Sequence, residues 1–286
     1  MYDEPLRRYT SFKIGGPARG LVLPADLDDL RKILHFVREY KVEVFLLGAG
    51  SNLLVRDGGF DGLIINLCLG FKNISHQDNL LRVQAGVLVP KLLSYAQANG
   101  LGGLEFLVGI PGTIGGALAM NAGVKDHEIG QFVKWVSVMR FNGEYECLNK
   151  EQIIFGYRVS SLSAEGIVIE AELELNPAKS QEIEFKMNEY IAKRRNTQPL
   201  WASAGSIFKN PAGDYAGRLI EEVGLKGRRS GDAQLSEEHA NFIVNLGSAS
   251  AHDVEELMQN VQREVLVKKG IWLEPEVRII GHKKEA

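Results

Sequence analysis

The chain is poor in the features that mark secreted, membrane-bound and metal-binding proteins. It has 286 residues but only two cysteines, Cys68 and Cys147, too few for a disulfide framework and not in a metal-binding or redox spacing. No stretch approaches the roughly eighteen apolar residues that a membrane span needs. The first ten residues are too polar for a secretory signal. We therefore expect a cytoplasmic protein that does not bind a membrane.

An excess of charge of one sign is also lacking. The 33 basic and 36 acidic residues give a net charge of -3, and no basic stripe indicates nucleic-acid binding. The six histidines are scattered and form no HExxH pattern, so we expect no metal site. We expect a monomer, a state for which the sequence has no direct signal.

Glycine is the abundant residue. The 31 glycines concentrate at 15–16, 48–62 and 100–123. Glycine permits positive φ angles and close approach of the main chain to another group. Each cluster alone is equally compatible with ordinary turns. Three clusters in the first half of the chain favour a ligand that lies against the backbone.

The hydrophobic pattern predicts an α+β protein. Helices are expected over 26–40, 182–195, 216–223 and 250–269, with a short one between Pro90 and Asn99, and strands over 42–47, 63–67, 81–85, 133–141, 167–175, 241–245 and 271–280. We expect a first lobe over 1–178, with subdomains of about 1–70 and 71–178, a smaller α/β lobe over 179–269, and a terminal strand in 270–286 that returns to the first lobe.

The first glycine loop, residues 47–55, follows a predicted strand, as a dinucleotide-binding loop does. It departs from the Rossmann pattern because Leu53 occupies the third glycine position and strand-like residues follow in place of a helix. An anion would therefore be bound by successive amide groups and by the Ser51 and Asn52 side chains. This loop alone does not identify a ligand.

The second glycine loop, residues 109–117, continues to Asn121 and Gly123. Small residues fill nearly every position, so a flat ring or a diphosphate would be able to lie directly on the main chain. A tightly packed turn with one turn of helix is the alternative interpretation.

The two loops, in this order and spacing, resemble the cofactor site of the UDP-N-acetylenolpyruvoylglucosamine reductase family, within the vanillyl-alcohol-oxidase-type FAD-binding superfamily. The resemblance extends over nearly the whole chain and includes the segments 10–16, 48–53, 110–116, 121–123, 155–158, 204–211 and 273–280. It implies a two-part FAD-binding lobe of that type, a smaller substrate-binding lobe, and a flavoprotein oxidoreductase. The FAD contacts that it implies are Gly48, Ala49, Gly50, Ser51, Asn52, Leu53, Ile110, Pro111, Gly112, Thr113, Gly115, Gly116, Asn121 and Gly123.

The same resemblance implies the reaction. A hydride from NADPH would pass through the flavin to the enolpyruvyl group of a UDP-linked amino sugar, a step of bacterial peptidoglycan precursor synthesis. The carbanion formed at C2 needs a positioned proton donor and nearby cations. By resemblance Ser206 is the proton donor, Arg158 the electrostatic stabiliser and Glu276 a carboxyl that acts on the developing enolate.

Each of these residues also has a structural interpretation from the residue pattern alone. Ser206 would serve as a turn serine, Arg158 as a surface arginine, and Glu276, on the same strand face as Glu274, as an exposed strand residue. Lys209, Asn210, Tyr157 and Gln234 are the expected substrate contacts. Arg194 and Arg195 end a predicted helix, where they contact the substrate or simply complement the helix dipole.

One departure from the family pattern concerns the segment after Arg158. The strand 167–175 follows within a few residues, as in the shorter subtype that lacks an insertion with a tyrosine that closes over the substrate. The sequence leaves open how the substrate is covered. Two other functions also stay open: another FAD-linked oxidase of the superfamily that acts on an alcohol or lactone, and a nucleotide-binding protein without catalysis.

Overall fold

The chain divides into two units. The structure, a computed structural model, describes residues 1–124 and 127–284. Unit 1 consists of residues 1–20, 50–63 and 195–286, and unit 2 of residues 21–49 and 64–194. The chain passes from one unit to the other inside the first glycine loop, between Ala49 and Gly50. The lobe boundaries expected near 178 and 269 stay a prediction.

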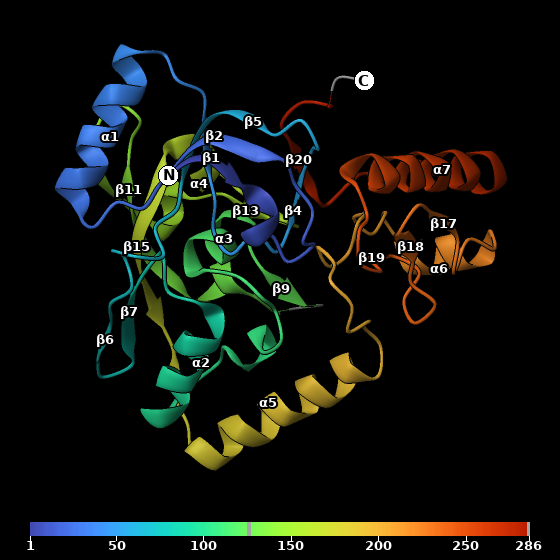
Figure 1. The fold of residues 1–286 in the computed structure, drawn as a ribbon. Helices are drawn as coiled ribbons and strands as arrows, with labels where there is room; N and C mark the ends of the chain where they lie inside the picture. Colours follow the sequence, from blue (N-terminus) through green and yellow to red (C-terminus); the bar gives the residue numbers. More distant parts are fainter. Residues whose placement is uncertain (125–126, 285–286) are drawn as a thin grey trace. The chain divides into compact units, whose positions relative to one another are not determined.

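Unit 2 is built on an antiparallel five-stranded sheet. Its order is β12 (Tyr145–Asn149), β11 (Val133–Met139), β15 (Ile167–Glu174), β7 (Leu80–Gln84) and β6 (Ile74–Gln77). Helices α2 (Val89–Ala98) and α3 (Ile114–Ala119) lie over one face of this sheet (Figure 1). Alternating strand residues such as Leu81, Val83 and Ala171 are buried beneath these helices. The sheet and helices therefore form one core that supports the second glycine loop at the start of α3.

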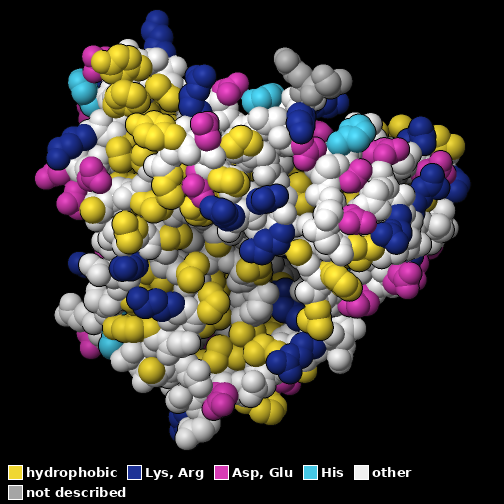
Figure 2. Space-filling view, viewed as in Figure 1, with side chains coloured by type: hydrophobic (Ala, Val, Ile, Leu, Met, Phe, Trp, Pro, Cys, Tyr) yellow, Lys and Arg dark blue, Asp and Glu magenta, His cyan; other side chains and the backbone are white. Residues whose placement is uncertain are grey.

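Two longer helices complete unit 2. Helix α1 (Leu27–Glu39) begins where Asp26 accepts a hydrogen bond from the Asp29 amide, 2.8 Å away. It buries Leu30 and Leu34 and leaves Phe36 and Tyr40 exposed. Hydrophobic side chains gather over this helix at the surface (Figure 2). Helix α5 (Ser180–Arg195) buries only Ile183 completely.

Short elements connect these parts of unit 2. They are β3 (Val44–Leu46), β8 (Leu101–Gly102), β9 (Gly123–Val124), β10 (His127–Glu128), β13 (Phe155–Gly156), β14 (Val159–Ser160), β16 (Asn176–Pro177), α4 (Leu162–Glu165), and the 3-10 helices η2 (Glu105–Leu107), η3 (Ile129–Phe132) and η4 (Lys150–Gln152). Strands β13 and β14 form a hairpin with Tyr157 and Arg158 at its turn.

Unit 1 combines a small sheet with two helices. The three-stranded antiparallel sheet has the order β17 (Arg229–Ser230), β18 (Ala233–Leu235) and β19 (Ile243–Asn245). Helices α6 (Ala216–Glu222) and α7 (Ala251–Lys269) pack with it around one hydrophobic core (Figure 1). Strand β4 (Leu53–Val55) pairs in parallel with β20 (Arg278–Ile280). Strand β1 (Tyr2–Pro5) pairs with β2 (Pro17–Val22), and η1 (Leu6–Arg8) follows β1; β2 and β5 (Phe60–Ile65) both continue into unit 2.

The expected α+β class and all of the expected helices are confirmed. The capping box of Ser250 and Asp253 opens α7, and Gly270 closes it in a left-handed conformation. No helix in residues 1–124 and 127–284 is both long and apolar enough to cross a membrane.

The expected strand over 271–280 is wrong for most of its length, because only Arg278–Ile280 is a strand. Pro275 has no amide hydrogen to donate to a ladder, which breaks the strand pattern. The preceding residues instead make single contacts with the segment that contains Ser206.

Candidate functional site

The unit 2 part of the first glycine loop, residues 47–49, lies against the second loop. A β-carbon placed on Gly48 would come within 2.7 Å of the Thr113 hydroxyl oxygen, so only glycine permits this approach. The Asn66 side-chain amide donates to the Gly48 carbonyl oxygen over 3.1 Å. Asn66 therefore fixes the first loop, although its own sequence position gave no signal of that role.

The second loop is joined to the segment that follows strand β7. The amides of Ile114 and Gly115 donate to the carbonyl oxygens of Val87 and Ala85, each over 2.9 Å. Thr113 caps α3 by accepting from the Gly116 amide. These bonds hold the backbone of the loop in place. Within the loop, Gly109, Pro111 and Gly116 are exposed, and Ile110 and Gly112 are half-buried.

Asn121 is a buried clamp behind this loop. Its Nδ2 donates to Glu128 over 2.6 Å and to the Gly156 carbonyl oxygen over 3.1 Å, and its Oδ1 accepts from the Gly130 amide over 3.0 Å. It is fully buried and has a φ of 43°, a conformation that costs a non-glycine residue free energy. The polar atoms of its side chain are therefore engaged inside unit 2.

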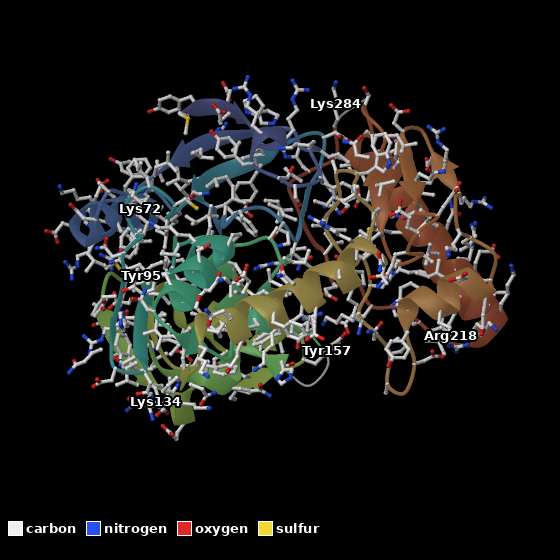
Figure 3. The ribbon with its side chains drawn as sticks, turned by 90° about the horizontal axis from the view of Figure 1, so that it is seen from below. Lys72, Tyr95, Lys134, Tyr157, Arg218 and Lys284 are labelled. Atoms are coloured by element: carbon white, nitrogen blue, oxygen red, sulfur yellow. The ribbon has the colours of Figure 1, made fainter. Side chains whose placement is uncertain are left out.

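The hydrogen bond from Asn121 to Gly156 supports the turn that contains Arg158. Gly156, which accepts from Asn121, ends strand β13, and Arg158 lies in the turn that follows, with a φ of 58°. Its Nη1 donates to the Gly123 carbonyl oxygen over 2.9 Å. Its guanidinium lies 5.4 Å from the centre of the neighbouring Tyr157 ring, which is half exposed (Figure 3). A strained turn thus holds the arginine beside the end of the second loop.

Ser206 and Glu276 come together in unit 1. Ser206 forms an isolated antiparallel bridge with Phe242, and the Glu276 amide donates to the Ile207 carbonyl oxygen over 2.8 Å. Both residues are half-buried. The two expected catalytic residues of this unit therefore lie on directly adjacent segments.

Two asparagines fix these segments. The Asn241 side chain accepts from the Phe208 amide over 3.0 Å and donates to the Phe208 carbonyl oxygen over 2.8 Å. Asn52, expected to contact the cofactor, donates through Nδ2 to the Glu276 carbonyl oxygen over 3.1 Å. The role of Asn241 was missed by sequence reasoning, because its bonds join residues 33 positions apart.

The expected substrate contacts of unit 1 already have partners within the protein. The Lys209 ammonium group pairs with Glu274 at 2.6 Å. Asn210 Oδ1 accepts from the Ala216 amide over 3.0 Å, at the start of α6, and Gln234 donates to the Gly227 carbonyl oxygen over 3.0 Å. The contacts of Lys209 and Asn210 leave both side chains partly exposed.

The expected site residues fall into two groups, one in each unit. Unit 2 holds Gly48, Ala49, Ile110, Pro111, Gly112, Thr113, Gly115, Gly116, Asn121, Gly123, Tyr157 and Arg158, and unit 1 holds Gly50, Ser51, Asn52, Leu53, Ser206, Lys209, Asn210, Gln234 and Glu276. The first group contains residues of both glycine loops, and the second contains Ser206 and Glu276.

Family models match both parts of the chain. A model for the FAD binding domain matches residues 18–148, and a model for the UDP-N-acetylenolpyruvoylglucosamine reductase C-terminal domain matches residues 197–280. A UDP-N-acetylenolpyruvoylglucosamine reductase 2 from Symbiobacterium thermophilum is 48% identical over 281 residues, which cover 98% of this chain and 91% of the relative. The chain belongs to the UDP-N-acetylenolpyruvoylglucosamine reductase family.

Other members of the family agree with this assignment. The reductase from Moorella thermoacetica is 44% identical and covers 98% of this chain and 92% of its own length. The crystal structure of the reductase from Thermus caldophilus superposes with a TM-score of 0.84 at 40% identity, and covers 96% of this chain and 97% of its own. The expected family, the oxidoreductase class and the FAD cofactor are therefore confirmed.

The residues of unit 2 fit FAD. The second loop presents exposed residues at Pro111 and Gly116, neither of which carries a long side chain that would block a flat ring or a diphosphate. The bonds of Ile114 and Gly115 to the segment that follows strand β7 hold that surface in place before any ligand arrives. Preorganised backbone of this kind lowers the ordering cost of binding.

Proposed function

We propose that the chain reduces the enolpyruvyl group of UDP-N-acetylglucosamine enolpyruvate to give UDP-N-acetylmuramate, with NADPH as the hydride source. Membership of the reductase family over 98% of the chain is the observation that carries this proposal. Bound FAD would supply the hydride-transfer chemistry between NADPH and C3 of the enolpyruvyl group. The cytoplasmic location and the monomeric state stay predictions.

Ser206 is proposed to deliver the proton to C2. A serine hydroxyl is a weak acid, so it acts only on a strongly basic carbanion that is held within hydrogen-bond reach. The bridge to Phe242 and the bonds of Asn241 to Phe208 fix the backbone on both sides of Ser206. That rigidity supports the precise placement that proton transfer requires.

Arg158 and Glu276 are proposed to meet the charge that develops. The planar guanidinium of Arg158 matches a carboxylate, and the strained turn fixes its direction. Glu276 is held through its backbone by Ile207 and Asn52, and its side-chain carboxyl is proposed to act on the enolate. Lys209, Asn210, Tyr157 and Gln234 are proposed as substrate contacts, with Lys209 exchanging its Glu274 partner for an anionic group of the substrate.

The test separates the two half-reactions. In Ser206→Ala, flavin reduction by NADPH should keep its normal rate, whereas flavin reoxidation by the enolpyruvyl sugar should slow by about a thousandfold, within the range of a lost general acid. Ser94→Ala, which removes an exposed helix hydroxyl that bonds only to Pro90, is the matched control. Unchanged reoxidation in Ser206→Ala would refute the proton-donor role.

The wild-type protein tests the reaction itself. Stopped-flow absorbance should show reduced flavin reoxidised by the enolpyruvyl sugar under anaerobic conditions. Rapid oxygen consumption with an alcohol and no response to the sugar would instead identify an oxidase. Binding of UDP-sugars without any redox response would identify a non-catalytic protein.

A further inference from the structure

Arg194 lies against the second glycine loop. It stands next to the last residue of α5, and a β-carbon on Gly109 would come within 2.7 Å of its Cδ and 3.3 Å of its Nε. Gly109 also has a φ of 75°, which side chains rarely adopt. The glycine at this position therefore gives the arginine room to cross the loop.

One edge of the Arg194 guanidinium is buried without a partner. Its Nε and Nη2 are inaccessible to solvent and have no hydrogen-bond acceptor among residues 1–124 and 127–284. These two nitrogens are adjacent and point the same way, so together they form the edge that binds two oxygens of one carboxylate or phosphate. Buried donors without acceptors are rare because they are costly to leave unmet.

The surroundings are electropositive. Burial, and secondly the positive charge of Arg158, lower the pKa of Arg194. An anion between them would relieve both the repulsion and the missing hydrogen bonds.

We propose that the Nε–Nη2 edge of Arg194 binds one oxyanion, a phosphate or a carboxylate, of a ligand on the second glycine loop. The proposal rests on the proposed function for the identity of the ligand. The experiment distinguishes two sources of this chemistry: the diphosphate of FAD, and the carboxylate or diphosphate of the enolpyruvyl sugar. Arg194 is half-buried as a whole, so part of the residue is in contact with solvent.

The experiment measures binding rather than turnover. Apoprotein of wild type, Arg194→Met and Arg194→Lys is titrated with FAD and with riboflavin, which has no phosphate, and the Kd is read from flavin fluorescence. The FAD-loaded proteins are then titrated with the UDP-linked enolpyruvyl sugar by flavin difference absorbance. Lys186→Gln, which removes an exposed cation from the same helix, is the matched control.

If the oxyanion belongs to FAD, Arg194→Met should weaken FAD about ten- to a hundredfold and leave riboflavin unchanged, as expected for lost charged hydrogen bonds. If it belongs to the substrate, FAD binding should persist and the sugar should weaken by a similar factor. Arg194→Lys should recover only part of the loss, because lysine lacks the two-pronged edge. The apoprotein of Arg194→Met should melt at or above the wild-type temperature, since it no longer buries unmet donors.

Three outcomes would overturn the proposal. They are Kd values within about twofold of the Lys186→Gln control for both ligands, an equal loss of riboflavin and FAD, or a fall in the melting temperature of the Arg194→Met apoprotein. A Kd difference within about twofold corresponds to a negligible difference in binding free energy. An equal loss of both flavins, or a lower melting temperature, indicates a structural role for Arg194. Failure of the proposed function is distinguishable, because wild type would then not respond to the sugar while its FAD titration still tests Arg194.

Discussion

The expected catalytic residues of the two units are held in different ways. In unit 2, Arg158 stands in a strained turn that one buried side chain, Asn121, fixes through three hydrogen bonds. In unit 1, Ser206 and Glu276 stand on segments joined by single backbone bonds and bridges, outside any regular sheet. The first arrangement concentrates its support in one residue, and the second distributes it.

This difference determines how strongly a single substitution should destabilise each unit. A buried network that is fully satisfied is rigid, but it fails as a whole when one member is changed. Support distributed over bonds from several residues loses only a fraction with each change. We therefore expect substitutions in unit 2 to have larger effects on stability than equivalent ones in unit 1.

The largest effect is expected for Asn121→Asp. The substitution keeps the shape of the side chain but sets a second carboxylate oxygen against Glu128 and the Gly156 carbonyl oxygen, so donors become repelling acceptors. We expect a loss of about 3 kcal/mol in the free energy of unfolding, the range for a broken buried charged network. Urea denaturation measures it.

A smaller effect is expected for Asn241→Ala in unit 1. Both bonds to the Phe208 backbone are lost, which leaves a buried amide and a buried carbonyl unmet, at a cost of about 2 kcal/mol. Because Ser206 lies two residues before Phe208, flavin reoxidation should slow more than flavin reduction. Stopped-flow measurement of the two half-reactions decides this, and an equal slowing of both would assign Asn241 to general stability.

A smaller effect again is expected for Asn52→Ala. Only one hydrogen bond, to the Glu276 carbonyl oxygen, is removed, so the free energy of unfolding should fall by about 1 kcal/mol. If Asn52 serves mainly to position Glu276, FAD affinity should stay close to the wild-type value while reoxidation slows. A large loss of FAD affinity with normal reoxidation would return Asn52 to the direct cofactor contacts that its sequence position indicates.

The parts of this architecture that sequence could predict are those with local causes. Asp26, Ser250 and Gly270 begin or end helices through bonds within a few residues, and the expected helices were confirmed. The strand over 271–280 was wrong because its residues bond to the segment near Ile207, far away in the chain.

For the candidate site, too, sequence predicts only features with local causes. The glycine loops stand out in sequence, but Gly48 exists for the approach of Thr113, and Gly109 for that of Arg194. The amide of Asn121 is used by Glu128, Gly130 and Gly156, which only the folded chain brings to it. Sequence thus locates the loops and cannot say which of their polar atoms remain for a ligand.

The smallest effect concerns a titration in unit 1. Burial lowers the pKa of His239 below its ordinary value of 6.5, and its Nδ1 accepts a hydrogen bond from the Asn241 amide over 3.2 Å. The folded state therefore prefers the neutral ring, while the unfolded chain takes up a proton near its ordinary pKa. The stability that His239 contributes is present above about pH 6.5 and is lost as the pH falls through and below that value.

His239→Gln keeps a hydrogen-bond acceptor and removes the titration. Melting temperatures measured from pH 8 to pH 5 should fall less steeply for this variant than for wild type, and the two curves should diverge only below about pH 6.5. Since protonation would take the acceptor from the Asn241 amide, the acid loss should also appear as slower flavin reoxidation before the protein unfolds. Parallel melting curves for His239→Gln and wild type would show that the titration of His239 does not affect stability. The supports at Asn121 and Asn241 would then differ only in their number of hydrogen bonds.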